Sequence, residues 1–313
     1  MLYSRRDVGR LALASLPFCA ARSEQIDSKI GGVRIGAISY SFNTLEHADP
    51  MAIVKAFADI RIGECELMSE HCEVLAGAPS AILGRQTTPQ QMAAVRAEAQ
   101  AKLAAWRAAT TPATWQAVTR KFNDAGVTVA ILCYNMMNDR MTDEDIEYGF
   151  RMAEGVGAEA LTTSTTLSMA KRIAPAADRH KFTVGYHGHD QTGYPNETAS
   201  LESYDTLMGY GKYSGIDLDI GHFTASNYDA VDFITKHHDK ITSVTIRDRK
   251  KDHGPGVFPW GAGDTPIKAV MQLMKKNQYP FPAILELEGF ERYSQDVVAL
   301  GKECFAYVRN CLA

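Results

Sequence analysis

Five side chains that can bind a metal ion lie within or just past three short apolar runs in the C-terminal part of the chain. They are His187, His189, Asp219, His222 and Glu286. The runs cover residues 182–186, 215–220 and 283–288, and each has the length of a buried strand. In a barrel of parallel strands, the C-terminal strand ends all open on one face. The five side chains are therefore predicted to meet in space.

The chemistry of this set favours one divalent cation. Mn²⁺ and Mg²⁺ prefer carboxylate oxygens and accept imidazole nitrogens, with Co²⁺ or Zn²⁺ as alternatives, and a set without thiolates disfavours a structural zinc site. Asp219 and Glu286 would supply negative charge and His187 a neutral nitrogen. Any one of these residues alone is more simply explained as a hydrogen-bonded group near a strand end. Five of them at the ends of three strands favour a shared site.

The rest of the chain supplies the elements that such a site needs. Eight runs read as strands, over residues 33–40, 64–68, 127–133, 159–164, 182–188, 215–221, 241–247 and 282–288. Helix starts lie between them, at Asp49-Pro50, Thr111-Pro112, Thr142 and Thr265-Pro266, where a capping residue meets a first-turn proline or acidic residues. The alternation of strand and helix predicts the α/β class and a single (β/α)8 TIM barrel over residues 22–313.

One stretch is longer than a minimal barrel needs. Residues 73–109 follow the second strand and contain an alanine-rich helical pattern over 89–109. This helical insertion follows the C-terminal end of a strand, and in barrels that face carries the active site. It is predicted either to close over the pocket or to pack as a solvated helix on the outside of the barrel.

The bulk composition limits the classes of partner. The chain has 313 residues, of which 45% are apolar and 22% charged, and its net charge is −4. This charge gives no general attraction for nucleic acid, and no apolar run is long enough for a permanent membrane span. We expect a small carbohydrate as the partner, and a homo-oligomer is compatible with the sequence.

The first 21 residues have the features of an export signal. Arg5 and Arg6 form a twin-arginine pair, a mildly apolar stretch follows over 11–21, and residues 19–21 suit cleavage after small side chains. We therefore predict a twin-arginine signal over residues 1–21 and a periplasmic location. The alternative is a frayed N-terminal helix.

Several motifs occur in order along the second half of the chain. They are Tyr186-His187-Gly188-His189, Leu218-Asp219-Ile220-Gly221-His222-Phe223, Val244-Thr245-Ile246-Arg247-Asp248, Pro259-Trp260-Gly261-Ala262-Gly263-Asp264 and Ile284-Leu285-Glu286. Together they resemble the sugar phosphate isomerase/epimerase family with a xylose isomerase-like barrel, in the branch that carries twin-arginine signals. The resemblance runs from residue 33 to the C-terminus and is strongest after residue 182.

The resemblance implies a metal held by a Glu, an Asp, a His and a Glu from four successive strand ends. The matching positions are His187, Asp219, Thr245 and Glu286. A His in the first position is familiar in the branch with a Tyr-His-x-His motif, but Thr245 stands where a ligand His is expected. With a divalent ion bound, the four expected ligands give a site with one net negative charge. The three ligands His187, Asp219 and Glu286 give a site with no net charge. Such a site should polarise a carbonyl more strongly and hold its metal less tightly.

Six further residues are candidates for contact with the substrate. They are Glu66, His222, Thr245, Arg247, Trp260 and Glu288. Glu66 reads either as a second carboxylate at the barrel mouth or, with Glu64, as part of a salt bridge. Glu288 lies two residues after Glu286, so the pleat points both side chains the same way. Trp260 could stack on a sugar face or pack ordinarily.

The leading functional hypothesis is a metal-assisted isomerase or epimerase that acts on a sugar or keto-sugar through an enediolate. The resemblance makes Glu286 the ligand and base, with His187 or His189 as the opposite acid–base group. A second hypothesis is a lyase or hydratase that acts on 3-keto-glycosides by β-elimination. A third is a barrel that has lost catalysis and binds a saccharide, and the Thr245 departure motivates it.

Overall fold

The computed structural model of the chain describes residues 24–46, 49–79, 89–137, 139–289 and 292–313. The predicted export signal, residues 1–21, lies outside the described residues. None of the helices in the described part of the chain is both long enough and apolar enough to cross a membrane.

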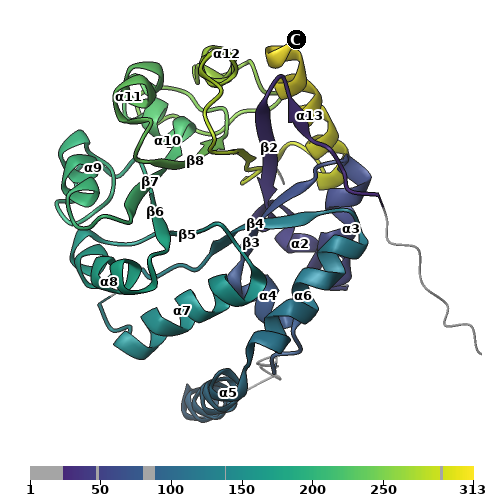
Figure 1. Cartoon of the computed structure of the whole chain (residues 1–313), viewed down its shortest axis with the longest axis vertical. Coiled ribbons are helices and arrows are strands. Elements are labelled where there is room, and N and C mark those ends of the chain that lie inside the picture. The colour runs from purple at the N-terminus through teal and green to yellow at the C-terminus, as the bar shows by residue number, and fades with distance from the viewer. Residues whose placement is uncertain (1–23, 47–48, 80–88, 138, 290–291) are drawn as a thin grey trace, which may run out of the picture.

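Eight parallel strands form a closed ring (Figure 1). They are β2 (Val33–Ile38), β3 (Glu64–Met68), β4 (Thr128–Cys133), β5 (Ala160–Thr163), β6 (Thr183–His187), β7 (Ser214–Asp219), β8 (Ile241–Ile246) and β9 (Ala283–Leu285). Each strand pairs with the next along the chain, and β2 also pairs with β9, which closes the barrel. A short strand, β1 (Lys29–Ile30), pairs antiparallel with β2. The predicted (β/α)8 TIM barrel is confirmed.

Helices surround this ring (Figure 1). In chain order they are η1 (Ser39–Phe42, a 3-10 helix), α2 (Asn43–Glu46), α3 (Met51–Ile60), α4 (Ser69–Leu75), α5 (Pro89–Ala109), α6 (Pro112–Asp124), α7 (Asp143–Val156), α8 (Leu167–His180), α9 (Leu201–Met208), α10 (Ile220–Ala225), α11 (Ala230–His237), α12 (Ile267–Asn277) and α13 (Val297–Leu312). The C-terminal α13 packs beside α3, so the first and last parts of the barrel sequence are neighbours in space.

The predicted helix starts agree with the structure because local capping chemistry defines them. Thr111 and Thr142 are the N-cap residues of α6 and α7, and each forms a capping box with the third residue of its helix. The prolines at 50 and 266 directly precede the first residues of α3 and α12. The two capping boxes satisfy backbone N–H groups that the first helical turn leaves free.

The insertion after β3 packs on the outside of the barrel. Trp106 of α5 lies against Trp115 of α6, with ring centroids 5.9 Å apart. Arg107 pairs with Glu73 at 2.7 Å, which ties the end of α5 to α4. None of the described residues of the insertion lines the cavity at the strand ends. Of the two predicted placements, the structure shows the helix packed outside.

The register of the ring sets which side chains become neighbours. His187 at the end of β6 pairs with Asp217 of β7, and Asp219 at the end of β7 pairs with Thr245 of β8. Every residue of β7 is buried. Because side chains alternate along a strand, Asp217 and Asp219 point the same way, in two successive layers of the barrel interior.

Candidate functional site

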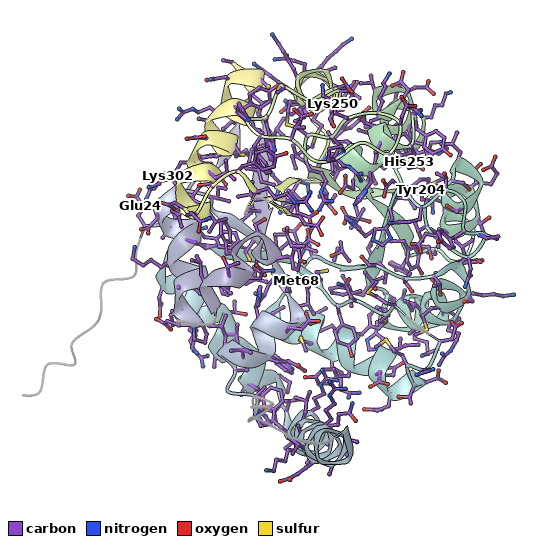
Figure 2. All side chains as sticks on the ribbon, turned by 180° about the vertical axis from the view of Figure 1, so that it is seen from behind. Glu24, Met68, Tyr204, Lys250, His253 and Lys302 are labelled. Atoms are coloured by element: carbon purple, nitrogen blue, oxygen red, sulfur yellow. The ribbon has the colours of Figure 1, made fainter. Side chains whose placement is uncertain are left out.

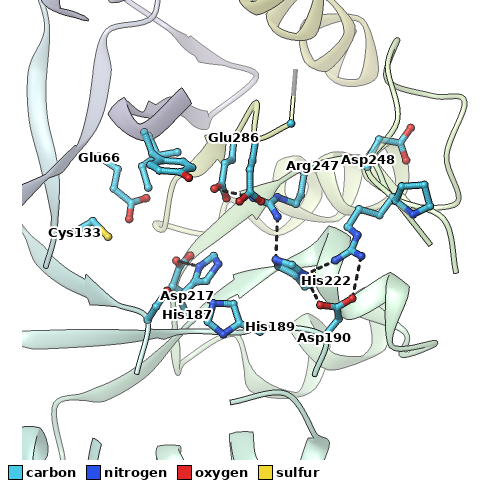
Figure 3. Close-up of a pocket in the computed structure, with 18 of the residues that line it drawn as sticks. Glu66, Cys133, His187, His189, Asp190, Asp217, His222, Arg247, Asp248 and Glu286 are labelled. Atoms are coloured by element: carbon cyan, nitrogen blue, oxygen red, sulfur yellow. Dashed lines mark hydrogen bonds and ion pairs between the residues drawn. The ribbon is translucent and has the colours of Figure 1, made fainter. Parts of the chain in front are cut away.

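A cavity of about 690 Å³ opens at the C-terminal ends of the strands (Figure 3). Its size is in the range of small-molecule sites. Met68, at the end of β3, lies near the centre of the ring, while Lys250 and His253 lie toward its edge (Figure 2). Eight of the residues expected at the site line the cavity: Glu66, His187, His189, His222, Arg247, Trp260, Glu286 and Glu288. The other two, Asp219 and Thr245, are 0% and 2% exposed.

His187, Asp219 and His222 form a group whose ligand atoms all lie within 4.8 Å of one another. Asp219 Oδ2 is 3.9 Å from His187 Nε2 and 3.8 Å from His222 Nε2. The other oxygen of Asp219 accepts the backbone N–H of His222 at 2.7 Å, as the N-cap of α10. Burial alone would raise the pKa of Asp219, but His222, Arg247 and His187 lower it below its usual value. The carboxylate is therefore ionised and held in one orientation.

Behind His187 lies Asp217, a carboxylate that sequence reasoning missed. Asp217 Oδ2 accepts from His187 Nδ1 at 2.7 Å, so Nε2 faces the cavity. Asp217 Oδ1 accepts hydroxyl hydrogens from Ser243 at 2.9 Å and Thr245 at 3.0 Å. Burial alone would lower the pKa of His187, but Asp217, Asp219 and Glu286 raise it to about 10. Without a metal ion, His187 is thus an imidazolium at neutral pH.

Thr245 therefore has a different place from the one expected. Its hydroxyl donates to Asp217 below the cavity, and Thr245 is not among the residues that line it. The spacing of Asp217 and Asp219 on one strand was the signal that could have revealed the second carboxylate, because alternate residues share a face.

Arg247 lies at the centre of the acidic part of the site (Figure 3). Its Nη2 is 2.7 Å from Glu286 Oε1 and 2.7 Å from Glu288 Oε2. Its Nε is 3.1 Å from Asp219 Oδ2, and its Nη1 is 2.9 Å from His222 Nε2. Arg247 is 8% exposed. As predicted, Glu286 and Glu288 point the same way, and both carboxylates meet this one guanidinium.

His222 is enclosed by charged neighbours. Its Nδ1 lies 3.2 Å from Asp190 Oδ1, and Arg249 contacts both the same ring nitrogen and the Asp190 carboxylate. Burial lowers the pKa of His222, which keeps the ring neutral. A neutral imidazole has one donor and one acceptor nitrogen. Both ring nitrogens face a guanidinium, Nδ1 that of Arg249 and Nε2 that of Arg247, so only one of these two contacts is an N–H···N hydrogen bond.

His189 belongs to a separate pair on the same wall. Its Nδ1 is 2.7 Å from Glu197 Oε1, and its Nε2 is 3.3 Å from the Ser164 hydroxyl. Its ring centroid lies 5.3 Å from that of His187. The carboxylate fixes which nitrogen faces the cavity, as Asp217 does for His187.

Glu66 is a buried carboxyl group on the opposite side of the ring, with 1% exposure. Burial, together with the charge of Asp217, raises its pKa to about 8. One oxygen accepts from the Thr162 hydroxyl, and Oε2 has no hydrogen-bond partner among the described residues. Glu64, two residues earlier, pairs with Arg34 at 2.8 Å. The carboxyl end of β3 therefore presents a largely protonated acid to the cavity at neutral pH.

The loop after β8 brings Trp260 to the cavity wall. Asp248 Oδ2 accepts the backbone N–H groups of Gly261 at 2.7 Å and Gly263 at 2.8 Å. A side chain at Gly263 would overlap the Asp248 carboxylate. Trp260 is 5% exposed and lies near Phe258, with the two rings nearly parallel. The aromatic wall is thus fixed by one carboxylate below the loop.

The group of His187, Asp219 and His222 suits a divalent metal ion. Two imidazoles and one carboxylate are donors that Zn²⁺, Co²⁺ and Mn²⁺ accept. Glu286 Oε2 is buried and has no hydrogen-bond partner among the described residues, and the contacts of buried Asp219 Oδ2 there are ion pairs with Arg247, His187 and His222. Glu286, expected as a ligand, lies outside this group of three, and its Oε1 pairs with Arg247. His222, expected among the metal-binding side chains and as a substrate contact, belongs to the group.

No protein family model matches the chain, and no curated protein is similar enough in sequence to count as a match. Solved structures do share its fold. A sugar phosphate isomerase/epimerase from Parabacteroides distasonis aligns over 92% of this chain and 97% of its own, with a TM-score of 0.58 and 13% identity. The probable 3-DHS dehydratase AsbF from Bacillus anthracis covers 87% of this chain and 97% of its own, with a TM-score of 0.61 and 13% identity.

A third similar structure is the IolI protein with a bound zinc atom. It covers 89% of this chain and 98% of its own, with a TM-score of 0.60 and 12% identity. A xylose isomerase domain protein from Salmonella typhimurium aligns in the same way, with a TM-score of 0.60 and 11% identity over 90% of this chain and 98% of its own. The chain therefore has the fold of the sugar phosphate isomerase/epimerase and xylose isomerase-like TIM barrels, as its motifs predicted.

Proposed function

We propose that this protein is an enzyme that removes and returns a proton at the carbon next to a carbonyl group in a sugar or keto-sugar. The observation that carries the proposal is the convergence of three acid–base groups from strands spread around the ring. Glu66 comes from β3, His187 from β6 and Glu286 follows β9, and all three line one cavity. Groups placed this way can act on different faces of one bound molecule.

Glu286 is the proposed base. Burial raises its pKa above the usual value, and its Oε2 has no hydrogen-bond partner among the described residues. A carboxylate in such surroundings accepts a proton more readily than one in water. His187 lies across the cavity with Nε2 directed inward (Figure 3). In the metal-free site, His187 as an imidazolium would donate a hydrogen bond from Nε2 to the carbonyl oxygen while the enediolate forms.

The charges of the lining favour an uncharged substrate. Three arginines and the His187 imidazolium line the cavity together with five carboxylates, Asp190, Asp217, Asp248, Glu286 and Glu288, while Glu66 is largely protonated. A sugar phosphate would bring further negative charge to these carboxyl groups. A neutral polyhydroxy carbonyl compound would instead find many hydrogen-bond partners, with Trp260 as an apolar wall. A divalent ion held by His187, Asp219 and His222 would polarise the carbonyl when bound.

The second candidate is elimination from a keto-glycoside, which starts with removal of the same proton. The pair His189–Glu197 on the same wall favours it, because a second imidazole there could protonate a leaving group. The fold similarity to a probable dehydratase agrees with this candidate.

Solvent exchange tests the proposal before any product is known. The protein is incubated in D2O with a neutral ketohexose and, separately, with a 3-keto-glucoside, and deuterium at carbon is followed by NMR and mass spectrometry. We expect enzyme-dependent exchange that Glu286→Gln abolishes. The matched control is Glu288→Gln, which removes the same charge from the half-exposed carboxylate beside it and should keep most of the exchange.

The products distinguish the candidates. Interconversion of keto-sugars without fragmentation supports the isomerase or epimerase, whereas release of the aglycone supports the lyase. Exchange that survives Glu286→Gln would remove Glu286 from the role of base. Saccharide binding without any exchange would mean that the barrel only binds.

A further inference from the structure

Arg247 contacts three carboxylates and one imidazole of the site. Its three guanidinium nitrogens reach Asp219, Glu286, Glu288 and Nε2 of His222, at distances from 2.7 to 3.1 Å. A planar guanidinium matches several carboxylates at once, which a lysine does not. The side chain is buried, so these contacts act in a medium where charges interact strongly.

The same atoms would hold a metal ion. Asp219 Oδ2 and His222 Nε2 lie 3.8 Å apart, and the guanidinium approaches the first to 3.1 Å and the second to 2.9 Å. The guanidinium of Arg247 thus occupies the space in front of both atoms that a metal ion would need. An ion at about 2.1 Å from both atoms would also lie against the positively charged guanidinium.

The backbone makes room for this arrangement. Gly221, the second residue of α10, lies beside the stem of Arg247. A Cβ at this position would be 2.5 Å from Arg247 Cγ and 3.1 Å from its Cδ. The lack of a side chain at 221 thus lets the arginine lie across the ends of β7 and β8.

We propose that Arg247 is the resident cation of this site, and that a divalent metal ion binds His187, Asp219 and His222 only after the guanidinium has been displaced. Glu288 provides the displaced group with an anchor, because its carboxylate already contacts Arg247 and is 50% exposed at the cavity mouth. The site therefore alternates between an arginine-filled and a metal-filled state, and the concentration of free metal decides which one is populated.

Calorimetric titration of the chelator-treated protein with ZnCl2, without substrate, tests this competition. Arg247→Met removes the competing charge, and we expect it to bind zinc at least about tenfold more tightly than the wild type. The matched control is Arg292→Met. Arg292 is exposed at the mouth of the same cavity. Its substitution removes one positive charge without touching the three proposed ligands, and it should alter the zinc affinity less than about twofold. Equal or weaker zinc binding by Arg247→Met would overturn the proposal.

Two further measurements keep the test decisive. If Arg247→Met does not fold without metal, Arg247→Lys answers the same question, because it keeps the charge but loses the forked contacts. It should show a smaller gain in zinc affinity, and no gain would count against the proposal. In a crystal soaked with zinc, Arg247 should have left His222. A crystal in which zinc contacts all three ligands while Arg247 is still bonded to His222 would refute the proposed competition. Since no substrate is involved, neither result bears on the proposed reaction.

Discussion

The raised pKa of Glu66 predicts how the stability of the protein depends on pH. The carboxyl group is fully buried, and its folded-state pKa is about 8 against an ordinary value of 4.5. Between these values the folded protein holds a proton that the unfolded chain has released. Stability therefore falls as the pH rises through this window. Glu66→Gln replaces the protonated form with a neutral group of the same shape and should remove this part of the pH dependence.

The size of the effect follows from the shift. Each pKa unit corresponds to about 1.4 kcal/mol, so ionisation of Glu66 inside the barrel costs up to about 5 kcal/mol once the pH is above 8. The variant and the wild type should have similar stability at pH 5. At pH 8.5 the variant should be more stable than the wild type by several kcal/mol. This gain is smaller if the variant weakens the hydrogen bond that Thr162 donates to Glu66.

Urea denaturation at a series of pH values measures the difference directly. The matched control is Glu64→Gln, which makes the same change two residues earlier on β3. There the carboxylate pairs with Arg34, so its loss should give no stabilisation at high pH. Stability curves for wild type and Glu66→Gln that run parallel from pH 5 to pH 8.5 would show that Glu66 is not held in its protonated form.

Two other predictions concern the supports of the site. Thr245→Val removes a hydroxyl that donates to Asp217 and should lower the free energy of unfolding by about 1 kcal/mol, as measured in urea; an unchanged value would mean that this hydrogen bond contributes nothing. Gly263→Ala places a methyl group against the Asp248 carboxylate and should lower the thermal midpoint by several degrees, whereas Gly256→Ala in the same loop, where a new Cβ has ordinary contacts, should leave it nearly unchanged.

Much of the fold could be predicted because each of its determinants is local. The strands are short apolar runs, and helix starts such as Thr111 and Thr142 are marked by their own capping groups. The placement of α5 could not be predicted in the same way. Its alanine-rich sequence suits either a lid or an outer helix, and contacts distant in sequence, such as Arg107 with Glu73, decide between them.

The site was predictable to the extent that strand ends define it. His187, His222 and Glu286 all reach the cavity because His187 ends β6, His222 lies in α10 directly after β7, and Glu286 directly follows β9. The role of Asp217 depends instead on the register between β6 and β7, which places it beside His187. The spacing of Asp217 and Asp219 indicates that both side chains share one face of β7, but the pairing of Asp217 with His187 depends on a register that only the closed ring defines.

Arg247 was expected at the site and lines the cavity, but its contacts could not be predicted from its neighbours in the sequence. The run 247–251 appears as one basic stretch, but the structure separates it. Arg247 enters the barrel and meets Glu286 and Glu288, while Lys250 pairs with Asp264 at the surface. A long side chain can reach partners on several strands, so its final contacts depend on where those strands lie.

The two positions at which the sequence departs from the ligand pattern that its resemblance implied lie in one connected arrangement. His187 stands where a carboxylate was expected, and Asp217 fixes the orientation of its ring through Nδ1 at 2.7 Å. Thr245 stands where a histidine was expected, and its hydroxyl donates to the same Asp217 at 3.0 Å. Beside them, Nε of Arg247 lies 3.1 Å from Asp219 Oδ2. Thr245→His would therefore remove a hydrogen bond that supports Asp217, and through it His187, whether or not the new imidazole could bind a metal ion.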